Sequence, residues 1–160
     1  MREFSGLFDL QTPYDLLKKF QYEYEKLEEY PLNQYIAFNF FVTAEHMLDW
    51  LYPDNQTMGD NRKKRKEERE KEIALCVCWD IASGAKHFKV LGRHDSAQDA
   101  RVRQGGFQAN IFQPDTFQTL SLVIELKGTA AQKLGQFIEV PKLARKVCDY
   151  WENHEDLAVY

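Results

Sequence analysis

Two apolar segments of this chain carry rows of polar side chains at helical spacing. In the first segment, residues 39–50, the polar members stand three or four residues apart: Asn39, Thr43, His46 and Asp49. The second segment, residues 76–88, repeats the pattern with Cys76, Asp80, Ser83 and His87. This spacing places each row on one face of a helix. Burial of so many polar groups is unfavourable unless they bond one another or serve a site, so the pattern predicts a polar seam between two helices.

The two histidines of the seam are the candidates for acid–base chemistry. His46 and Asp49 lie one helical turn apart, so the carboxylate can hold the imidazole in one tautomer, as a general base requires. The alternative is a histidine bonded to a neighbour inside a helical core. His87 follows Lys86 at the expected end of its helix, where side chains border solvent. Its alternative role is that of a cation at the helix C-terminus.

The same seam contains residue types that bind metal ions. His46, Asp49, Asp80 and His87 would supply two imidazoles and two carboxylates, a set that suits zinc, manganese or iron. Neither helix carries the Glu-x-x-His or His-Glu-x-x-His pattern that preforms such sites. We therefore predict no metal and no cofactor, and a metal-dependent helical enzyme is the weaker alternative.

A run of charged residues precedes the second segment. Residues 61–72 contain no apolar side chain, and the run begins with five consecutive cations after Asn61: Arg62, Lys63, Lys64, Arg65 and Lys66. One interpretation is a solvated helix start, held by opposite charges three and four residues apart. The other is a phosphate-binding patch at one end of the seam.

Helix signals divide the chain into four expected helices. Thr12 and Pro13 are typical of an N-cap and first helical position, and Pro31 ends the first helix. Pro53 ends the second, so the first two form an antiparallel hairpin. A last helix opens at Val140-Pro141 and should pack against the others with Val147, Tyr150 and Trp151. We expect helices over about 13–30, 32–52, 62–87 and 140–155.

A β-hairpin is expected between the third and fourth helices. Residues 106–112 and 117–126 are rich in β-branched and aromatic side chains, and residues 113–116 supply a turn between them. We expect the hairpin over about 106–127, and the preceding stretch 92–105 is the least ordered-looking part. The fold class is therefore mainly α, a four-helix bundle with an appended β-hairpin in a single domain over residues 1–160.

Composition restricts the classes of partner. The net charge of −4 gives no general attraction to nucleic acid or anionic lipid. The three cysteines form no repeated spacing, so free thiols in a reducing compartment are expected. No stretch approaches the length of a membrane span or a signal peptide, which predicts a cytoplasmic protein without membrane contact.

The motifs carry a resemblance to a known family. The helix hairpin, the helix ending in Asp80-Ile-Ala-Ser-Gly-Ala-Lys-His87-Phe, and the closing helix resemble the HEPN domain of prokaryotic toxins and defence proteins. The chain is also similar to short bacterial proteins with Phe-x-Thr-Ala-x-His-x-x-Asp-Trp and Asp-x-Ala-x-Gly-x-Lys-His-Phe helices. The resemblance covers the four helices, about two thirds of the chain. It implies a four-helix HEPN-like bundle and a homodimer, formed through helical faces near His87.

The resemblance departs from the active enzymes at one residue. HEPN ribonucleases place four to six residues between an Arg and a His; His87 matches the His, but Asp80, Ile81 and Ala82 occupy the Arg positions. A carboxylate there would repel phosphate instead of stabilising it. The resemblance thus implies a catalytically silent interaction or nucleotide-sensing module in bacterial or phage defence, with a protein partner or RNA.

The alternative is a metal-independent, toxin-like endoribonuclease of a toxin–antitoxin system. In it, His87 acts as general acid or base, supported by His46 and Asp49. Lys86 or the basic run at 62–66 holds the phosphate.

Overall fold

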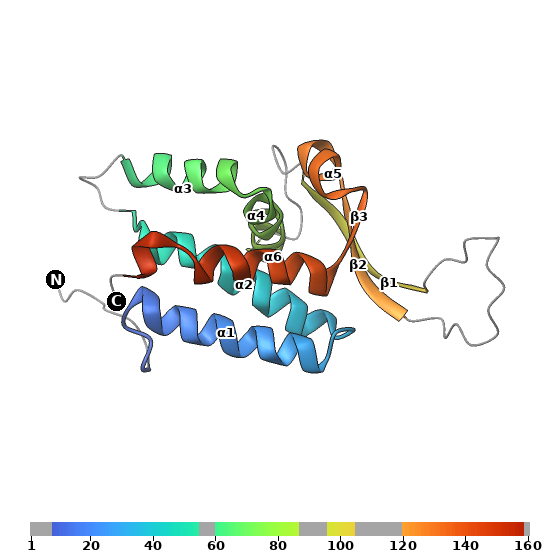
Figure 1. The fold of residues 1–160 in the computed structure, drawn as a ribbon, viewed down its shortest axis with the longest axis horizontal. Coiled ribbons are helices and arrows are strands. Elements are labelled where there is room, and N and C mark those ends of the chain that lie inside the picture. Colours follow the sequence, from blue (N-terminus) through green and yellow to red (C-terminus); the bar gives the residue numbers. More distant parts are fainter. Residues whose placement is uncertain (1–7, 55–59, 87–95, 105–119, 159–160) are drawn as a thin grey trace.

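A helical hairpin forms one side of the molecule. The computed structural model describes residues 8–54, 60–86, 96–104 and 120–158 (Figure 1). Helix α1 spans Pro13–Glu29 and α2 spans Gln34–Leu51. Thr12 caps α1: its hydroxyl accepts from the Asp15 backbone N–H at 3.2 Å, and the Asp15 carboxylate accepts from the Thr12 N–H at 3.1 Å. The two expected N-terminal helices are therefore present and lie antiparallel.

The single helix predicted over 62–87 is two helices. Helix α3 spans Asp60–Lys71 and α4 spans Ile73–Lys86, and the two point in different directions (Figure 1). Glu72 lies between them. Its carboxylate accepts from the Ala74 N–H at 2.9 Å and its carbonyl accepts from the Leu75 N–H at 3.0 Å. Glu72 thus caps the N-terminus of α4, which needs acceptors for its first N–H groups. No proline or glycine marks the break, which is why the sequence suggested a continuous helix.

A small antiparallel sheet lies at one end of the bundle. Strand β1 spans Ala97–Gln104, β2 spans Leu120–Leu126 and β3 spans Phe137–Glu139, in the order β1-β2-β3. Val102 pairs with Leu122, and Ile124 pairs with Ile138. Helix α5, Gly128–Leu134, connects β2 to β3. The expected fold class, mainly α with an appended hairpin, is confirmed for the described part of the chain.

Of the hairpin predicted over 106–127, the second strand is present as β2. The partner of β2 in the structure is β1, which falls in the stretch 92–105 that the sequence marked as least ordered. Strand β1 reads Ala-Gln-Asp-Ala-Arg-Val-Arg-Gln, with low strand propensity, and its order comes from backbone pairing with the apolar β2. The expected first strand at 106–112 and the turn at 113–116 lie outside the described residues.

The last helix completes the core. Helix α6 spans Val140–Glu152, and a short 3-10 helix, η1, follows at Glu155–Leu157, where continuation of α6 to 155 was expected. Trp151, Phe20 and Phe40 are fully buried. The rings of Phe20 and Phe40 stack with their centres 4.7 Å apart. Val147 is also fully buried in this core. The apolar side of α6 is consequently used inside the chain and is not a surface for association.

Candidate functional site

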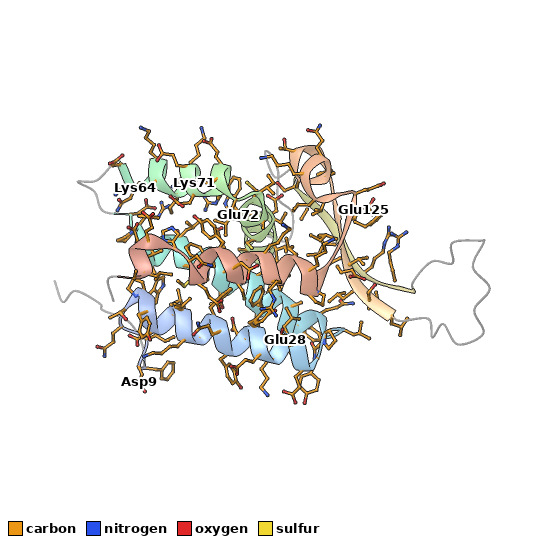
Figure 2. All side chains as sticks on the ribbon, in the orientation of Figure 1. Asp9, Glu28, Lys64, Lys71, Glu72 and Glu125 are labelled. Carbon is orange, nitrogen blue, oxygen red and sulfur yellow. The ribbon has the colours of Figure 1, made fainter. Side chains whose placement is uncertain are left out.

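A cleft of about 520 Å³ lies between α2, α3 and α4. Its lining combines charged, aromatic and hydroxyl side chains from the three helices: Glu45, His46, Asp49, Arg62, Arg65, Lys66, Arg69, Trp79, Ala82 and Ser83. Figure 2 shows the dense row of side chains along α3, with Lys64, Lys71 and Glu72 labelled. Four cationic side chains face two carboxylates in this cleft. The cleft therefore has an excess of positive charge, although the chain as a whole carries −4.

Arg65 anchors α3 at the floor of the cleft. Its guanidinium donates to the Tyr52 carbonyl at 2.8 Å and to the Asp54 carboxylate at 2.5 Å, and lies 3.2 Å from Asp49. The side chain is only 9% exposed. Because its donors are directed at protein acceptors, Arg65 holds the helix in place and is not the group that a ligand would meet first.

Arg69 forms the second buried contact of α3. Its guanidinium faces the Glu45 carboxylate with both Nη2 and Nε, and lies 5.0 Å from the centre of the Trp79 ring. Burial raises the pKa of Glu45 to about 7, although the adjacent Arg69 charge opposes this shift. Glu45 is therefore a carboxyl group that changes charge near neutral pH, which is a property of many functional sites.

Arg62 and Lys66 supply the accessible positive charge. Their side chains are 82% and 76% exposed, and each makes only a long ion pair of 3.6 Å, to Asp54 and Glu70 respectively. They stand four residues apart on α3 and therefore share one face of the helix. His46, which is exposed on α2, and Ser83, which is half-buried on α4, line the same cleft. This arrangement suits an anion.

Six residues proposed from the sequence meet in the cleft. They are His46, Asp49, Ser83, Arg62, Arg65 and Lys66. The predicted buried seam is nevertheless wrong, because Asn39, His46 and Asp49 are exposed. The buried face of α2 is centred on Phe40, Phe41, Ala44, Met47 and Leu48. His46 and Asp49 lie at the border of that face, so these two members of the polar row line a cleft instead of a core.

Two other residues of the predicted seam have structural roles. The Thr43 hydroxyl is buried and accepts a hydrogen bond from the Lys19 ammonium at 2.7 Å. The Asp80 carboxylate is buried and accepts from the backbone N–H groups of Ser96 and Ala97 at 2.6 and 2.9 Å. Asp80 thereby joins α4 to the start of β1, and neither side chain lines the cleft.

The remaining candidates are elsewhere or outside the described residues. Lys63 pairs with Glu67 at 3.6 Å, and Lys64 lies 5.6 Å above the ring of Tyr52, so neither belongs to the cleft. Lys86 is the last residue of α4. His87 lies outside the described residues, and its predicted role stays a prediction.

Three members of the four-residue set weighed above as metal ligands, His46, Asp49 and Asp80, lie in the described residues, and the fourth, His87, does not. Within these ranges, no group of three or more His, Cys, Asp or Glu side chains is placed to hold a metal ion. Asp80 accepts backbone hydrogen bonds and does not join His46 and Asp49 at the cleft. The described helices also include none long and apolar enough to cross a membrane.

Cys78 and Cys148 pack in the core, and Cys76 is half-buried at its edge. Cys76, Cys78 and Cys148 are free thiols, and burial raises the pKa of Cys148 to about 12. Burial also raises the pKa values of Cys76 and Cys78. Such thiols stay protonated and are poor nucleophiles, so they contribute no chemistry to the cleft.

A second hollow of about 530 Å³ lies on the other side of α3, against the C-terminal segment. Its polar groups already bond one another. The Glu68 carboxylate accepts hydrogen bonds from the Tyr150 hydroxyl and, at 2.6 Å, from the Lys71 ammonium, and it lies 3.3 Å from the His154 ring. Nearby, the Tyr52 hydroxyl donates to the Asp156 carboxylate at 2.5 Å. Burial raises the pKa of Glu68, but hydrogen bonds from Lys71, Tyr150 and His154 outweigh it, so this pKa lies below its usual value. These hydrogen bonds therefore hold α3 against the C-terminal segment.

Apart from Ala82, sequence reasoning missed three residues that line the cleft: Glu45, Arg69 and Trp79. Arg62, Lys66 and Arg69 recur at positions i, i+4 and i+7, a spacing that indicates one helical face. That signal was available within the charged run. Glu45 carried no signal, because a single carboxylate on a helix is usually solvated.

Comparison of the chain with protein-family models, with curated proteins and with solved structures gives no match. The relationship to HEPN domains therefore stays a prediction that rests on the two helix motifs.

Proposed function

We propose that the protein is a catalytically silent nucleotide-sensing module, which binds the phosphate groups of a nucleotide in the cleft between α2, α3 and α4. The observation that carries the proposal is the pair of exposed cations, Arg62 and Lys66, beside the aromatic ring of Trp79 in one cleft. Phosphate oxygens accept strong charge-assisted hydrogen bonds from such side chains.

The other lining groups supply contacts for the rest of a nucleotide. Trp79 is half-buried, and a tryptophan ring is a surface on which nucleobases stack. The Ser83 hydroxyl and the His46 imidazole can donate or accept hydrogen bonds to a ribose or a base. An aromatic ring next to accessible cations distinguishes a nucleotide from inorganic phosphate, since the ring adds affinity only for a ligand with a base.

The defence context and the lack of catalysis come from the HEPN resemblance. The Arg that the active ribonucleases place before the His is replaced in this sequence by Asp80, Ile81 and Ala82. The Asp80 carboxylate accepts two backbone hydrogen bonds, so the residue at this position connects α4 to β1. A binding module that reports a nucleotide to a protein partner is consistent with both observations.

Titration calorimetry with ATP, AMP and inorganic phosphate tests the proposal. The double variant Arg62→Ala/Lys66→Ala should weaken ATP binding by about tenfold or more, since two charge-assisted contacts are lost. The matched control is Lys63→Ala/Lys64→Ala, which removes the same charge from the same helix outside the cleft. Equal losses in both doubles, or no binding of any probe to the wild type, would overturn the proposal.

A second candidate is metal-independent RNA cleavage. It is favoured by one observation: the Glu45 carboxyl, with a pKa of about 7, and the exposed His46 line the same cleft. Two groups able to exchange protons are what general acid–base catalysis requires. Wild type, His46→Ala and His87→Ala should be incubated with single-stranded RNA in EDTA between about pH 5 and 9. If the wild type leaves the RNA intact, this candidate is eliminated and the binding module stands.

The proposal that the protein is a homodimer rests on the resemblance to HEPN domains. The apolar side of α6 does not offer an interface, because Val147 and Trp151 are buried in the chain's own core. Faces near His87 are therefore the proposed interface. Light scattering at micromolar protein should give twice the mass of one chain, and the mass of a single chain would refute the dimer.

A further inference from the structure

The side chain of Arg69 is held between two groups of the cleft wall. Its Nη2 bonds to one Glu45 carboxylate oxygen, and its Nε lies 3.5 Å from the other. The Trp79 ring lies 5.0 Å away on α4. The Glu45 side chain is 6% exposed and that of Arg69 is 17% exposed. The guanidinium is thus fixed in orientation, and part of it reaches the cleft.

The Glu45 carboxylate occupies the donors that a phosphate would use. A guanidinium presents paired N–H groups that fit a carboxylate or a phosphate in the same two-point geometry. While Glu45 is ionised, the pair with Arg69 is close to neutral, and a ligand finds only Arg62 and Lys66 as available cations. When Glu45 is neutral, Arg69 becomes a third cation on the same face of α3.

We propose, on the premise that the cleft binds a phosphate-bearing ligand, that Glu45 is an internal competitor for Arg69, so that protonation of its carboxyl group strengthens ligand binding. Glu45 takes up one proton from solvent in this step, and no covalent bond of the protein changes. The cleft then senses pH as well as its ligand.

The surroundings of Glu45 place this exchange in the neutral range. Burial between α2, α3 and α4 raises the pKa of Glu45, Arg69 and more weakly Arg65 of α3 lower it, and Asp49 on the same helix adds a smaller upward shift, with a net value of about 7. The thiols of Cys76 and Cys78 on α4 also face it and remain neutral. A change from about pH 8 to about pH 6 therefore converts most Glu45 from the charged to the neutral form.

The first test removes the charge of Glu45 and keeps its shape. Glu45→Gln should bind ATP about tenfold more tightly than the wild type at about pH 8, because Arg69 gains a charge-assisted contact to phosphate. The matched control is Glu67→Gln, which removes the same charge from α3, where Glu67 pairs with Lys63 and contacts no cleft arginine. Its affinity for ATP should equal that of the wild type.

The second test uses pH with inorganic sulfate, whose charge is constant between about pH 6 and 8. The His46→Gln background removes the imidazole of the cleft, so that an effect of Glu45 can be assigned to Glu45. In this background, sulfate affinity should rise as pH falls, and addition of Glu45→Gln should abolish the rise. If Glu45→Gln does not fold, the sulfate affinity of His46→Gln is measured against pH by itself. A rise as the pH falls supports the inference, and a constant affinity overturns it.

The outcomes separate the two proposals. If the wild type binds ATP through Arg62 and Lys66 but Glu45→Gln binds no more tightly and sulfate affinity is independent of pH, this inference is overturned and the nucleotide site stands. If the wild type binds neither ATP nor sulfate, both proposals fail.

Discussion

The guanidinium of Arg65 donates a hydrogen bond of 2.8 Å to the main-chain carbonyl of Tyr52, the C-cap residue that follows α2. A cation at this point interacts favourably with the negative end of the α2 dipole and also satisfies a terminal carbonyl group. Helix α3 contains no apolar residue, and its buried positions are Asn61, Arg65 and Glu68. Its attachment to the bundle is therefore polar.

Arg65→Ala should reduce the free energy of unfolding by about 2 to 4 kcal/mol, because it leaves the Tyr52 carbonyl without its charged donor and removes the contacts to Asp49 and Asp54. Urea unfolding followed by circular dichroism measures the change. Arg62→Ala removes the same charge from an 82% exposed position and should cost less than about 0.5 kcal/mol. Equal stabilities of the two variants would contradict the anchoring role of Arg65.

Asp80→Ala should destabilise the fold by about 1 to 3 kcal/mol, since the backbone N–H groups of Ser96 and Ala97 lose their acceptor. The destabilisation would come from the lost link between α4 and the start of β1, and not from a bonded seam between two helices. Asp80→Asn retains one carbonyl oxygen and should cost less. Thermal melts compare the variants, and an unchanged melting temperature for Asp80→Ala would refute this role.

The stability of the fold should fall as pH rises through neutrality because of Glu45. Its folded-state pKa, about 7, lies above the ordinary value of 4.5, so the folded protein holds this proton more tightly than the unfolded chain does. The stabilising contribution is fully present below about pH 4.5 and is lost as pH rises through about 7. The loss is on the order of 3 kcal/mol.

Denaturant unfolding at a series of pH values measures this contribution. Glu45→Gln should have a flatter dependence than the wild type between about pH 5 and 8, whereas Glu67→Gln should keep the wild-type dependence. Identical profiles for the wild type and Glu45→Gln would show that Glu45 is ionised throughout this range.

Helix ends with local signals were predicted closely. Thr12 and Asp15 form a capping box, and Pro31 and Pro53 follow the first two helices, so α1 and α2 begin and end within about two residues of the expected positions. The break at Glu72 and strand β1 were not predicted. Their causes are a carboxylate that turns back to cap α4 and a pairing between segments that are distant in sequence.

The sequence alone predicted that the fold is mainly helical and that the first two helices form a hairpin. It offered His46, Asp49 and the basic run as candidate site residues, with a solvated helix start as the other interpretation of the run. Helical period and caps act within a few residues, so they can be recognised in the sequence alone. The choice of cations that face the cleft depends on contacts between distant parts of the chain. Helix α3 has no apolar stripe to set its rotation, and contacts to the Tyr52 carbonyl, Asp54 and Glu45 set it instead. Those contacts bury Arg65, hold Arg69 against Glu45 and leave Arg62 and Lys66 accessible.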